Sequence, residues 1–397
     1  MAEPFRAVRI SERVFWVGAI DWSIRDFHGY ATNRGTTYNA YLVMADEIAL
    51  VDTVKAPFRD EFMSRIRSVV DPRDIKVIVS NHSEMDHSGL LPQTVKAVEP
   101  REVLASPMGV KALAEHFHGL AGVTAVKDGE RRSLGNATLT FYETRMLHWP
   151  DSMISYLDGD EVLFSQDAFG MHLASSERFD DELDPALLNE EAAKYYANIL
   201  MPYSGLVTKA LDRLGSLKLP AKLVAPDHGP VWRRGFAGIL ASYARWAEQR
   251  PTRKAVVVYD TMWGSTAAMA RAIGDGLAAG GASANLLPLS AADRSEAATE
   301  VLEAGALLVG SSTLNGQMLP TVADILTYLK GLKPANLVGQ AFGSYGWSGE
   351  AVQHVQDALV QMKVDMVGEA QRCRYVPTGE HLASCRALGE LVAARLP

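Results

Sequence analysis

The chain has 397 residues, 48% of them hydrophobic and 22% charged, which is an ordinary composition for a globular protein of two or more domains. Its 39 Lys and Arg against 47 Asp and Glu give a net charge of −8, which argues against nucleic acid and anionic membranes as partners. No apolar stretch approaches the roughly 18 residues that a membrane helix needs, and residues 1–6 lack the pattern of an export signal, so we expect a cytoplasmic protein.

Short strands and helices mix over the first 250 residues. Strands are predicted at residues 38–44, 48–51 and 75–79, and helices at 58–69, 109–116 and 189–214. Strand pairs that alternate with helices in this way are expected for an αββα sandwich. A polar segment that contains a proline, residues 248–254, separates this pattern of strands and helices from a different one that follows it. We therefore expect domains over 1–250 and 254–397.

The strand at 75–79 runs directly into a segment rich in metal-competent side chains. Four of them stand within six residues, and they converge only if the chain turns sharply after the strand: His82, Glu84, Asp86 and His87. Imidazoles are borderline donors, whereas carboxylates are hard donors that neutralise charge and bridge two ions. This mixture predicts a metal site.

Three more metal-competent residues each follow an apolar strand, and strand ends are where α/β proteins place their chemistry. They are His148 after residues 139–144, Asp167 after 162–165 and His228 after 223–225. The seven side chains bring three carboxylates and four imidazoles, a set that favours iron, while zinc stays an alternative. Two ions in such a site lie roughly 3.5–4 Å apart, a distance that one carboxylate such as Asp167 spans.

After residue 254 the pattern becomes a regular alternation of strands and helices. Residues 255–259 form a continuous apolar strand, typical of a parallel sheet that is covered on both faces. Met269, Ile273 and Leu277 then recur every fourth residue, as on the buried stripe of a helix. Further strands are predicted at residues 284–289, 306–310 and 338–344.

The loop after the first of these strands is rich in hydroxyls and precedes a helix, which favours a phosphate site. It lacks the lysine of a triphosphate-binding loop and the three glycines of a dinucleotide-binding loop, so the monophosphate of FMN fits best. The loops after the third and fourth strands are expected to flank the flavin ring, with Tyr345 and Trp347 against it. The predicted cofactor residues are Thr261, Met262, Trp263, Gly264, Ser265, Thr266, Ser312, Thr313, Leu314, Asn315, Gly316, Ser344, Tyr345, Gly346, Trp347, Ser348 and Gly349.

The only cysteines, Cys373 and Cys385, make no C-x-x-C pair, so the chain carries no rubredoxin module and no iron–sulfur cluster of its own. Reduced thiols are expected. An external electron carrier is therefore needed if the flavin takes part in electron transfer.

The motif His-x-Glu-x-Asp-His at residues 82–87, the three later ligands and the flavodoxin-like segment together resemble the flavodiiron proteins, in the short form without a rubredoxin or reductase extension. The resemblance covers nearly the whole chain. In zinc hydrolases of the same superfamily the position of Glu84 is normally His. The resemblance implies an α/β protein, with an N-terminal metallo-β-lactamase-like αββα sandwich and a C-terminal flavodoxin-like doubly wound parallel sheet.

The resemblance also assigns ligands and neighbours. One iron would be held by His82, Glu84, His148 and Asp167, and the other by Asp86, His228 and Asp167, with His87 as a variable ligand. Polar residues that line the pocket in the family match His28, His172 and Tyr195, as proton donors or hydrogen-bond partners.

The activity implied by the resemblance is the reduction of O2 to water, of NO to N2O, or of both. Electrons would pass through FMN from a rubredoxin or a similar small carrier, in a head-to-tail homodimer or a tetramer built from it. The sequence ranks neither the two substrates nor the donors. Two rival functions stay open: a zinc-dependent hydrolase with a fused flavin domain, and a non-catalytic electron-transfer flavoprotein.

Overall fold

The computed structural model of the chain describes residues 3–397. Met1 and Ala2, the first two residues of the predicted first domain, lie outside the described residues. The chain divides into two compact units. The first unit consists of Met1–Phe27, Thr32–Tyr195 and Gly205–Ala244, and the second of His28–Ala31, Tyr196–Ser204 and Arg245–Pro397. In the described part, no helix combines the length and the apolar character that crossing a membrane requires.

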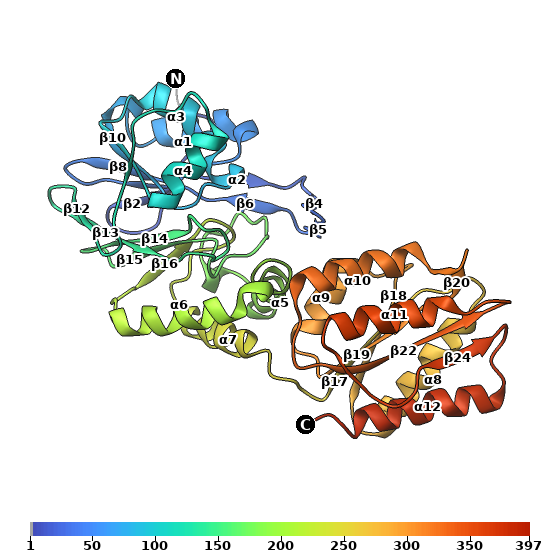
Figure 1. Cartoon of the computed structure of the whole chain (residues 1–397). Coiled ribbons are helices and arrows are strands. Elements are labelled where there is room, and N and C mark those ends of the chain that lie inside the picture. Colours follow the sequence, from blue (N-terminus) through green and yellow to red (C-terminus); the bar gives the residue numbers. More distant parts are fainter. Residues whose placement is uncertain (1–2) are drawn as a thin grey trace. The chain divides into compact units, whose positions relative to one another are not determined.

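The first unit contains two sheets that face each other, with helices α1, α3 and α4 outside one sheet and α6 and α7 outside the other (Figure 1). One sheet has the order β1 (Val8–Arg9), β2 (Val14–Trp16), β7 (Tyr41–Val43), β8 (Ile48–Val51), β9 (Ile75–Ser80), β10 (Glu102–Ala105) and β11 (Val123–Ala125). The other sheet has the order β12 (Arg131–Ser133), β13 (Thr138–Glu143), β14 (Met153–Leu157), β15 (Val162–Gln166) and β16 (Leu223–Pro226). The helices are α1 (Arg59–Arg67), α2 (Met85–Ser88), α3 (Leu91–Val98), α4 (Pro107–His116), α5 (Pro185–Tyr195), α6 (Ser204–Leu217) and α7 (Phe236–Glu248).

Strand β9 shows why this part forms a four-layer sandwich. Successive side chains of a strand point to opposite faces, so Val77 and Val79 pack into the core between the two sheets, while Ile78 packs under the helices. Both faces of the strand are therefore apolar from Val77 on, as the hydrophobic run predicted, while Lys76 near its start is exposed. The predicted αββα sandwich is confirmed.

The predicted strand at residues 38–44 is divided in the structure. Strand β6 (Thr36–Tyr38) pairs with β3 (Ala19–Asp21), and β7 begins only at Tyr41. Between them Asn39 leaves the ladder: its backbone N–H donates to the carbonyl of Asp227 at 2.7 Å, and its side-chain amide donates to the carbonyls of Pro226 and Gly229. The prediction of one continuous strand was wrong because the hydrogen-bond partners of Asn39 belong to the end of β16.

The predicted helix at residues 189–214 is also interrupted. Helix α5 ends at Tyr195, a wide helical turn (Tyr196–Leu200) and a tight one (Met201–Tyr203) follow, and α6 starts at Ser204. Pro202 lacks the N–H that a regular helix needs and excludes the regular conformation of the turn before it. The hydrophobic periodicity alone did not reveal this break.

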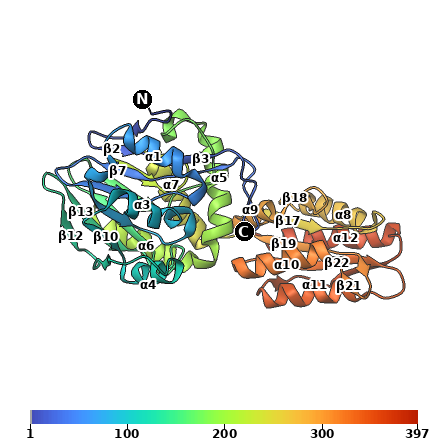
Figure 2. The same cartoon turned by 90° about the horizontal axis from the view of Figure 1, so that it is seen from above.

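The second unit is built on one parallel sheet, in the order β18 (Ser283–Pro288), β17 (Lys254–Tyr259), β19 (Ala306–Gly310), β22 (Val338–Tyr345) and β23 (Asp365–Met366), with β24 (Gln371–Arg374) also paired to β22. Helices α8 (Ser265–Ala279) and α12 (Gly379–Ala393) lie on one face of the sheet, and α10 (Pro320–Leu332) and α11 (Glu350–Gln361) lie on the other (Figure 2). Helix α9 (Arg294–Leu302) precedes β19, and the short strands β20 (Thr313–Leu314) and β21 (Gln317–Met318) pair after it. The doubly wound sheet is thus confirmed.

The core of the second unit follows the predicted periodicity. Met269, Ile273 and Leu277 of α8 are buried against β17 and β19, as their four-residue spacing predicted. Cys373 and Cys385 lie in the same core as buried thiols. Because all strands of this sheet are parallel, their carboxyl ends and the loops that follow them meet at one edge.

Candidate functional site

The metal-competent residues of the first motif lie on a single sharp turn after β9. His82 follows the strand, Glu84 is the residue that caps the start of the one-turn helix α2, and Asp86 and His87 lie within α2. Gly89 ends this helix, and a side chain there would stand 2.3 Å from the carbonyl oxygen of Met85. The tight turn therefore requires glycine and brings four side chains from a six-residue segment into one pocket.

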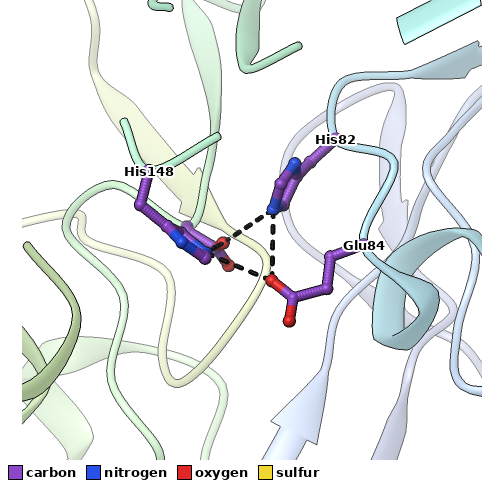
Figure 3. A group of neighbouring side chains, drawn as sticks. His82, Glu84 and His148 are labelled. Atoms are coloured by element: carbon purple, nitrogen blue, oxygen red, sulfur yellow. Dashed lines mark hydrogen bonds and ion pairs between the residues drawn. The ribbon is translucent and has the colours of Figure 1, made fainter. Parts of the chain in front are cut away.

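A first group of side chains converges from three separate strand ends (Figure 3). Nε2 of His148 lies 3.2 Å from Oε2 of Glu84 and 3.0 Å from Oδ2 of Asp167. Nε2 of His82 lies 3.4 Å and 3.3 Å from the same two oxygens. One ligand atom from each of the four residues thus falls within 4.8 Å of the others, which is the arrangement that one ion requires.

A second group lies beside the first and shares one residue with it. Nε2 of His228 is 3.1 Å from Oδ2 of Asp86, and Nε2 of His87 is 3.3 Å from the same oxygen. The remaining oxygen of Asp167, Oδ1, is 3.2 Å from Nε2 of His87 and 3.5 Å from Nε2 of His228. Asp167 therefore presents one carboxylate oxygen to each group. The structure brings together all seven residues that the sequence singled out.

Several of these polar atoms are buried without a hydrogen bond. Among the described residues, this holds for Nε2 of His82, Nε2 of His87, Oδ1 of Asp86 and Oδ1 of Asp167. An unsatisfied buried polar group is costly, and cations compensate such groups. These inward-facing nitrogen and oxygen atoms therefore fit a pair of metal ions.

The charges of the cluster suit metal binding as well. Burial raises the pKa of Glu84, but the close imidazoles of His148 and His82 outweigh burial and lower the pKa to about 2. Burial also opposes ionisation of Asp86, while the charge of His87 and a hydrogen bond from His228 bring its pKa down to about 2. These carboxylates are therefore anionic at neutral pH, as metal ligands must be.

The sequence did not single out the residues directly behind the ligands. Asp151 accepts hydrogen bonds from Nδ1 of His82 at 3.1 Å and from the backbone N–H of Ser83 at 2.6 Å. Nδ1 of His228 instead faces the carbonyl oxygen of Thr37 at 2.5 Å. Asp151 stands only three positions after His148, but no local pattern indicates that its carboxylate reaches a residue of another sheet.

A pair of buried carboxylates lies behind His87. Oδ2 of Asp227 is 3.6 Å from Nδ1 of His87, and Asp52 accepts hydrogen bonds from the backbone and the side chain of Asn81 at 2.7 Å and 3.0 Å. Burial raises the pKa of Asp52 to about 6 and that of Asp227 well above its ordinary range. Asp227 directly precedes His228, so its place next to a predicted ligand is a signal in the sequence.

Aromatic and polar side chains form a wall beside His228. The rings of His172 and Tyr195 lie 4.5 Å and 6.1 Å from the ring of His228, and Nδ1 of His172 contacts the hydroxyl of Thr36 at 2.8 Å. Phe27, which the sequence did not point to, completes this wall at 4.9 Å from His172 and 6.4 Å from His228.

The third predicted pocket residue, His28, has a different setting. It is exposed, has a φ of 56° and belongs to the segment His28–Ala31, which groups with the second unit. Its role in the pocket stays a prediction.

The candidate cofactor pocket lies in the second unit, at the carboxyl ends of β17, β19 and β22. Gly264 has a φ of 87° and stands directly before α8, and its N–H donates to the hydroxyl of Thr261 at 3.1 Å. The first turn of α8 therefore faces a loop with room for a phosphate group. Thr266 is fully buried, and its hydroxyl contacts those of Ser312 and Ser344 at 3.1 Å and 2.9 Å. The hydroxyls of Thr266 in the first turn of α8, Ser312 after β19 and Ser344 near the end of β22 thus meet at the pocket.

The pocket has a volume of about 420 Å³ and is mostly apolar. Large apolar side chains stand exposed around it, with Trp263 92% and Trp347 88% exposed. Exposed apolar groups around a hollow indicate a ligand or partner that covers them. The lining residues are Met262, Trp263, Ser265, Ser312, Thr313, Leu314, Asn315, Ser344, Tyr345, Gly346, Trp347, Tyr375 and Val376.

Eleven of these lining residues were predicted from the sequence, and two were not. Tyr375 and Val376 follow β24, whose parallel pairing with β22 brings a further strand end to the same edge. The other predicted residues lie in the same three segments without lining the hollow itself, Thr266 in the first turn of α8 and the rest in the loops: Thr261, Gly264, Gly316, Ser348 and Gly349.

Comparison with known protein families gives one match for each unit. Residues 36–229 match the model described as "ODP family beta lactamase", and residues 257–389 match the flavodoxin model. The first match spans all seven metal-competent residues, and the second spans the predicted cofactor loops.

Individual relatives match over nearly the whole chain. A nitric oxide reductase of Moorella thermoacetica is 46% identical over 100% of both chains. The solved structure of rubredoxin oxygen:oxidoreductase from Desulfovibrio gigas is 42% identical, has a TM-score of 0.96 and matches over 98% of both chains. That of the flavodiiron protein from Giardia intestinalis is 32% identical, has a TM-score of 0.93 and matches over 98% of this chain and 96% of the other. The present chain belongs to the flavodiiron proteins and is an oxidoreductase.

Proposed function

We propose that the protein reduces O2 to water, NO to N2O, or both, at a non-haem diiron site that receives electrons through FMN. The observation that carries this proposal is the position of Asp167, whose two oxygens face two different groups of ligand atoms. A carboxylate so placed is suited to bridge two ions roughly 3.5–4 Å apart. Relatives named for NO reduction and for O2 reduction support both substrates.

Each ion has its own set of side chains in this proposal. His82, Glu84, His148 and Asp167 hold one iron, and Asp86, His228 and Asp167 hold the other, with His87 as a further ligand of the second. When bound, a diferrous pair and a reduced FMN together supply four electrons, the number that converts O2 to water, while coupling of two NO molecules takes two. Glu84 favours iron over zinc at the first position, since it adds a hard anion where zinc hydrolases carry imidazole.

The protein's own side chains keep water away from the metal pair and orient the ligands. Phe27 and Tyr195 stand beside His228, and Trp149 presents its ring at a right angle to His82, with 5.2 Å between ring centroids. Aromatic rings in these places limit the access of bulk water to the metal pair. His172 is a candidate hydrogen-bond partner for bound substrate, because burial lowers its pKa well below the ordinary range and keeps it neutral.

In the second domain FMN occupies the pocket between the three strand-end loops. The loop from Thr261 to Thr266 and the first turn of α8 take the phosphate, and Trp263, Trp347 and Tyr375 lie against the flavin ring. Ser312 and Ser344 line the pocket, and their hydroxyls join the loop after β19 and the end of β22 to Thr266 of α8.

The proposal extends to the organisation of the chain and its partners. The diiron domain covers 1–250 and the FMN domain covers 254–397. A head-to-tail homodimer, or a tetramer built from such dimers, places the flavin of one subunit beside the irons of its partner. The donor is a rubredoxin or a similar small carrier, as the name of the D. gigas relative indicates for that protein. We place the protein in the cytoplasm.

Two rival functions are separated from this one by a single set of measurements. A zinc hydrolase with a flavin domain would contain zinc and no redox-active metal, and a non-catalytic flavoprotein would accept electrons without consuming O2 or NO. We expect the purified full-length protein to contain about two irons and one FMN per chain. After anaerobic reduction, its rates with O2 and with NO should be compared with the same donor. A protein that contained zinc alone and showed no change of metal valence would contradict the proposal.

A further inference from the structure

Asp151 connects the two sheets of the first unit at the first ligand group. It lies in the loop between β13 and β14, three residues after His148, and it is only 3% exposed. Its carboxylate contacts Nδ1 of His82 at 3.1 Å and the N–H of Ser83 at 2.6 Å, and both of these residues follow β9 of the other sheet. Its backbone carbonyl accepts a hydrogen bond from Ser106 at 2.7 Å. One short loop thus supplies a ligand and holds another.

The second ligand group is held differently. Nδ1 of His228 faces a backbone carbonyl, that of Thr37, at 2.5 Å. Nδ1 of His87 faces the carboxylate of Asp227, but at 3.6 Å, which is longer than a hydrogen bond. A carboxylate in hydrogen-bond contact with an imidazole makes the imidazole a stronger donor than a neutral carbonyl does. The two ligand groups therefore differ in the residues that support them.

We propose that Asp151 is a positioning residue that fixes His82 with its Nδ1–H on the carboxylate and its Nε2 lone pair directed at the first ion, and that it makes this position bind its ion more tightly than the second. This proposal rests on the proposed diiron site. It adds the statement that the first ion is bound more tightly than the second. It predicts that substitution of Asp151 weakens the binding of only one of the two ions.

The test uses the full-length, FMN-loaded protein freed of metal and titrated anaerobically with Co²⁺, followed by visible absorption. The wild-type protein is expected to take up two ions in two steps. In Asp151→Ala the tighter step weakens by roughly 10–100-fold, the usual effect of removing such a partner, and the weaker step stays unchanged. Asp151→Asn keeps an acceptor oxygen at the same distance but loses the charge. The affinity of its tighter step should therefore fall less than that of Asp151→Ala.

Asp160→Asn is the matched control. Asp160 is an equally buried carboxylate of the same unit that contacts Ser11 and Arg13 instead of a metal-competent residue. It is expected to lower the melting temperature without changing either binding step. Equal weakening of both steps in Asp151→Ala, or no weakening at all, would overturn the role of Asp151. A wild-type protein that binds fewer than two ions would instead overturn the diiron site itself.

Discussion

Oδ2 of Asp167 lies 3.0 Å from Nε2 of His148, although the two residues follow different strands of the same sheet. The other oxygen of Asp167 faces the second ligand group on α2 and after β16. The register of β13, β14 and β15 brings both residues to one edge of the sheet. One carboxylate at this edge is therefore the point at which the two metal positions meet.

We expect Asp167→Ala to lose iron at both positions and to lose turnover, while FMN stays bound in the other domain. The physical reason is that both positions lose a charged ligand at once. Metal analysis and flavin absorbance of the purified variant measure the two effects separately. Asp128→Ala, which removes a surface partner of Arg213, is the control. An unchanged iron content in Asp167→Ala would show the assignment to be wrong.

Glu84→Ala is expected to reduce the consumption of O2 and of NO by at least roughly tenfold. Glu84 contributes an anion to the first position only, so the second position should keep its ion. Rates with both gases, measured with one donor at equal FMN content, test this. Full activity in the variant would favour the view that the first domain is only a scaffold.

The exposed rings around the cofactor pocket are expected to contribute to FMN affinity. Trp347→Ala should weaken binding by about 1–2 kcal/mol, or roughly 5–30-fold, because it removes an aromatic face from the flavin ring. Fluorescence titration of the FMN-free protein measures the dissociation constant. Trp22→Ala removes an exposed tryptophan of the first unit and should leave the affinity unchanged. Equal affinities in all three proteins would exclude Trp347 from the pocket.

Asp160 provides a pH-dependent test of stability. Burial raises the pKa of its carboxyl group, but the hydrogen bonds from Ser11 and Arg13 outweigh burial and hold the pKa below the ordinary 3.8. A depressed pKa stabilises the folded state above the unfolded value, and this contribution is lost as the pH falls through the folded value. Asp160→Asn should therefore lower the free energy of unfolding by about 2 kcal/mol at neutral pH.

The difference between Asp160→Asn and the wild-type protein should shrink as the pH falls from about 4 through the lowered pKa of the folded state, since the carboxyl group of Asp160 then loses its charge. Urea unfolding of the metal-free, FMN-loaded chain at several pH values measures it. A difference that stayed constant down to the lowest pH would assign the effect to geometry instead of charge.

Local hydrophobic patterns in the sequence predicted most of the fold. The apolar runs of β17 and β19, and that of β9 apart from the exposed Lys76, predicted strands that are buried on both faces, because burial of both faces leaves no polar alternation. The same patterns failed where the chain makes contacts outside its own element. Asn39 interrupts a strand because its partners lie at the end of β16, and Pro202 interrupts a helix because it lacks a donor.

The sequence by itself determined the seven metal-competent residues and the hydroxyl-rich loop before α8, because donor types at the ends of apolar strands are local features. Only the tertiary structure decided that Asp151 holds His82, that Phe27 borders His228 and that Tyr375 lines the cofactor pocket. Asp151 lies 69 residues after His82, and Phe27 lies 201 residues before His228. Tyr375 follows a different strand from the predicted cofactor residues. Such contacts depend on which strands pair and in which register, and hydrophobic periodicity carries no information about that choice.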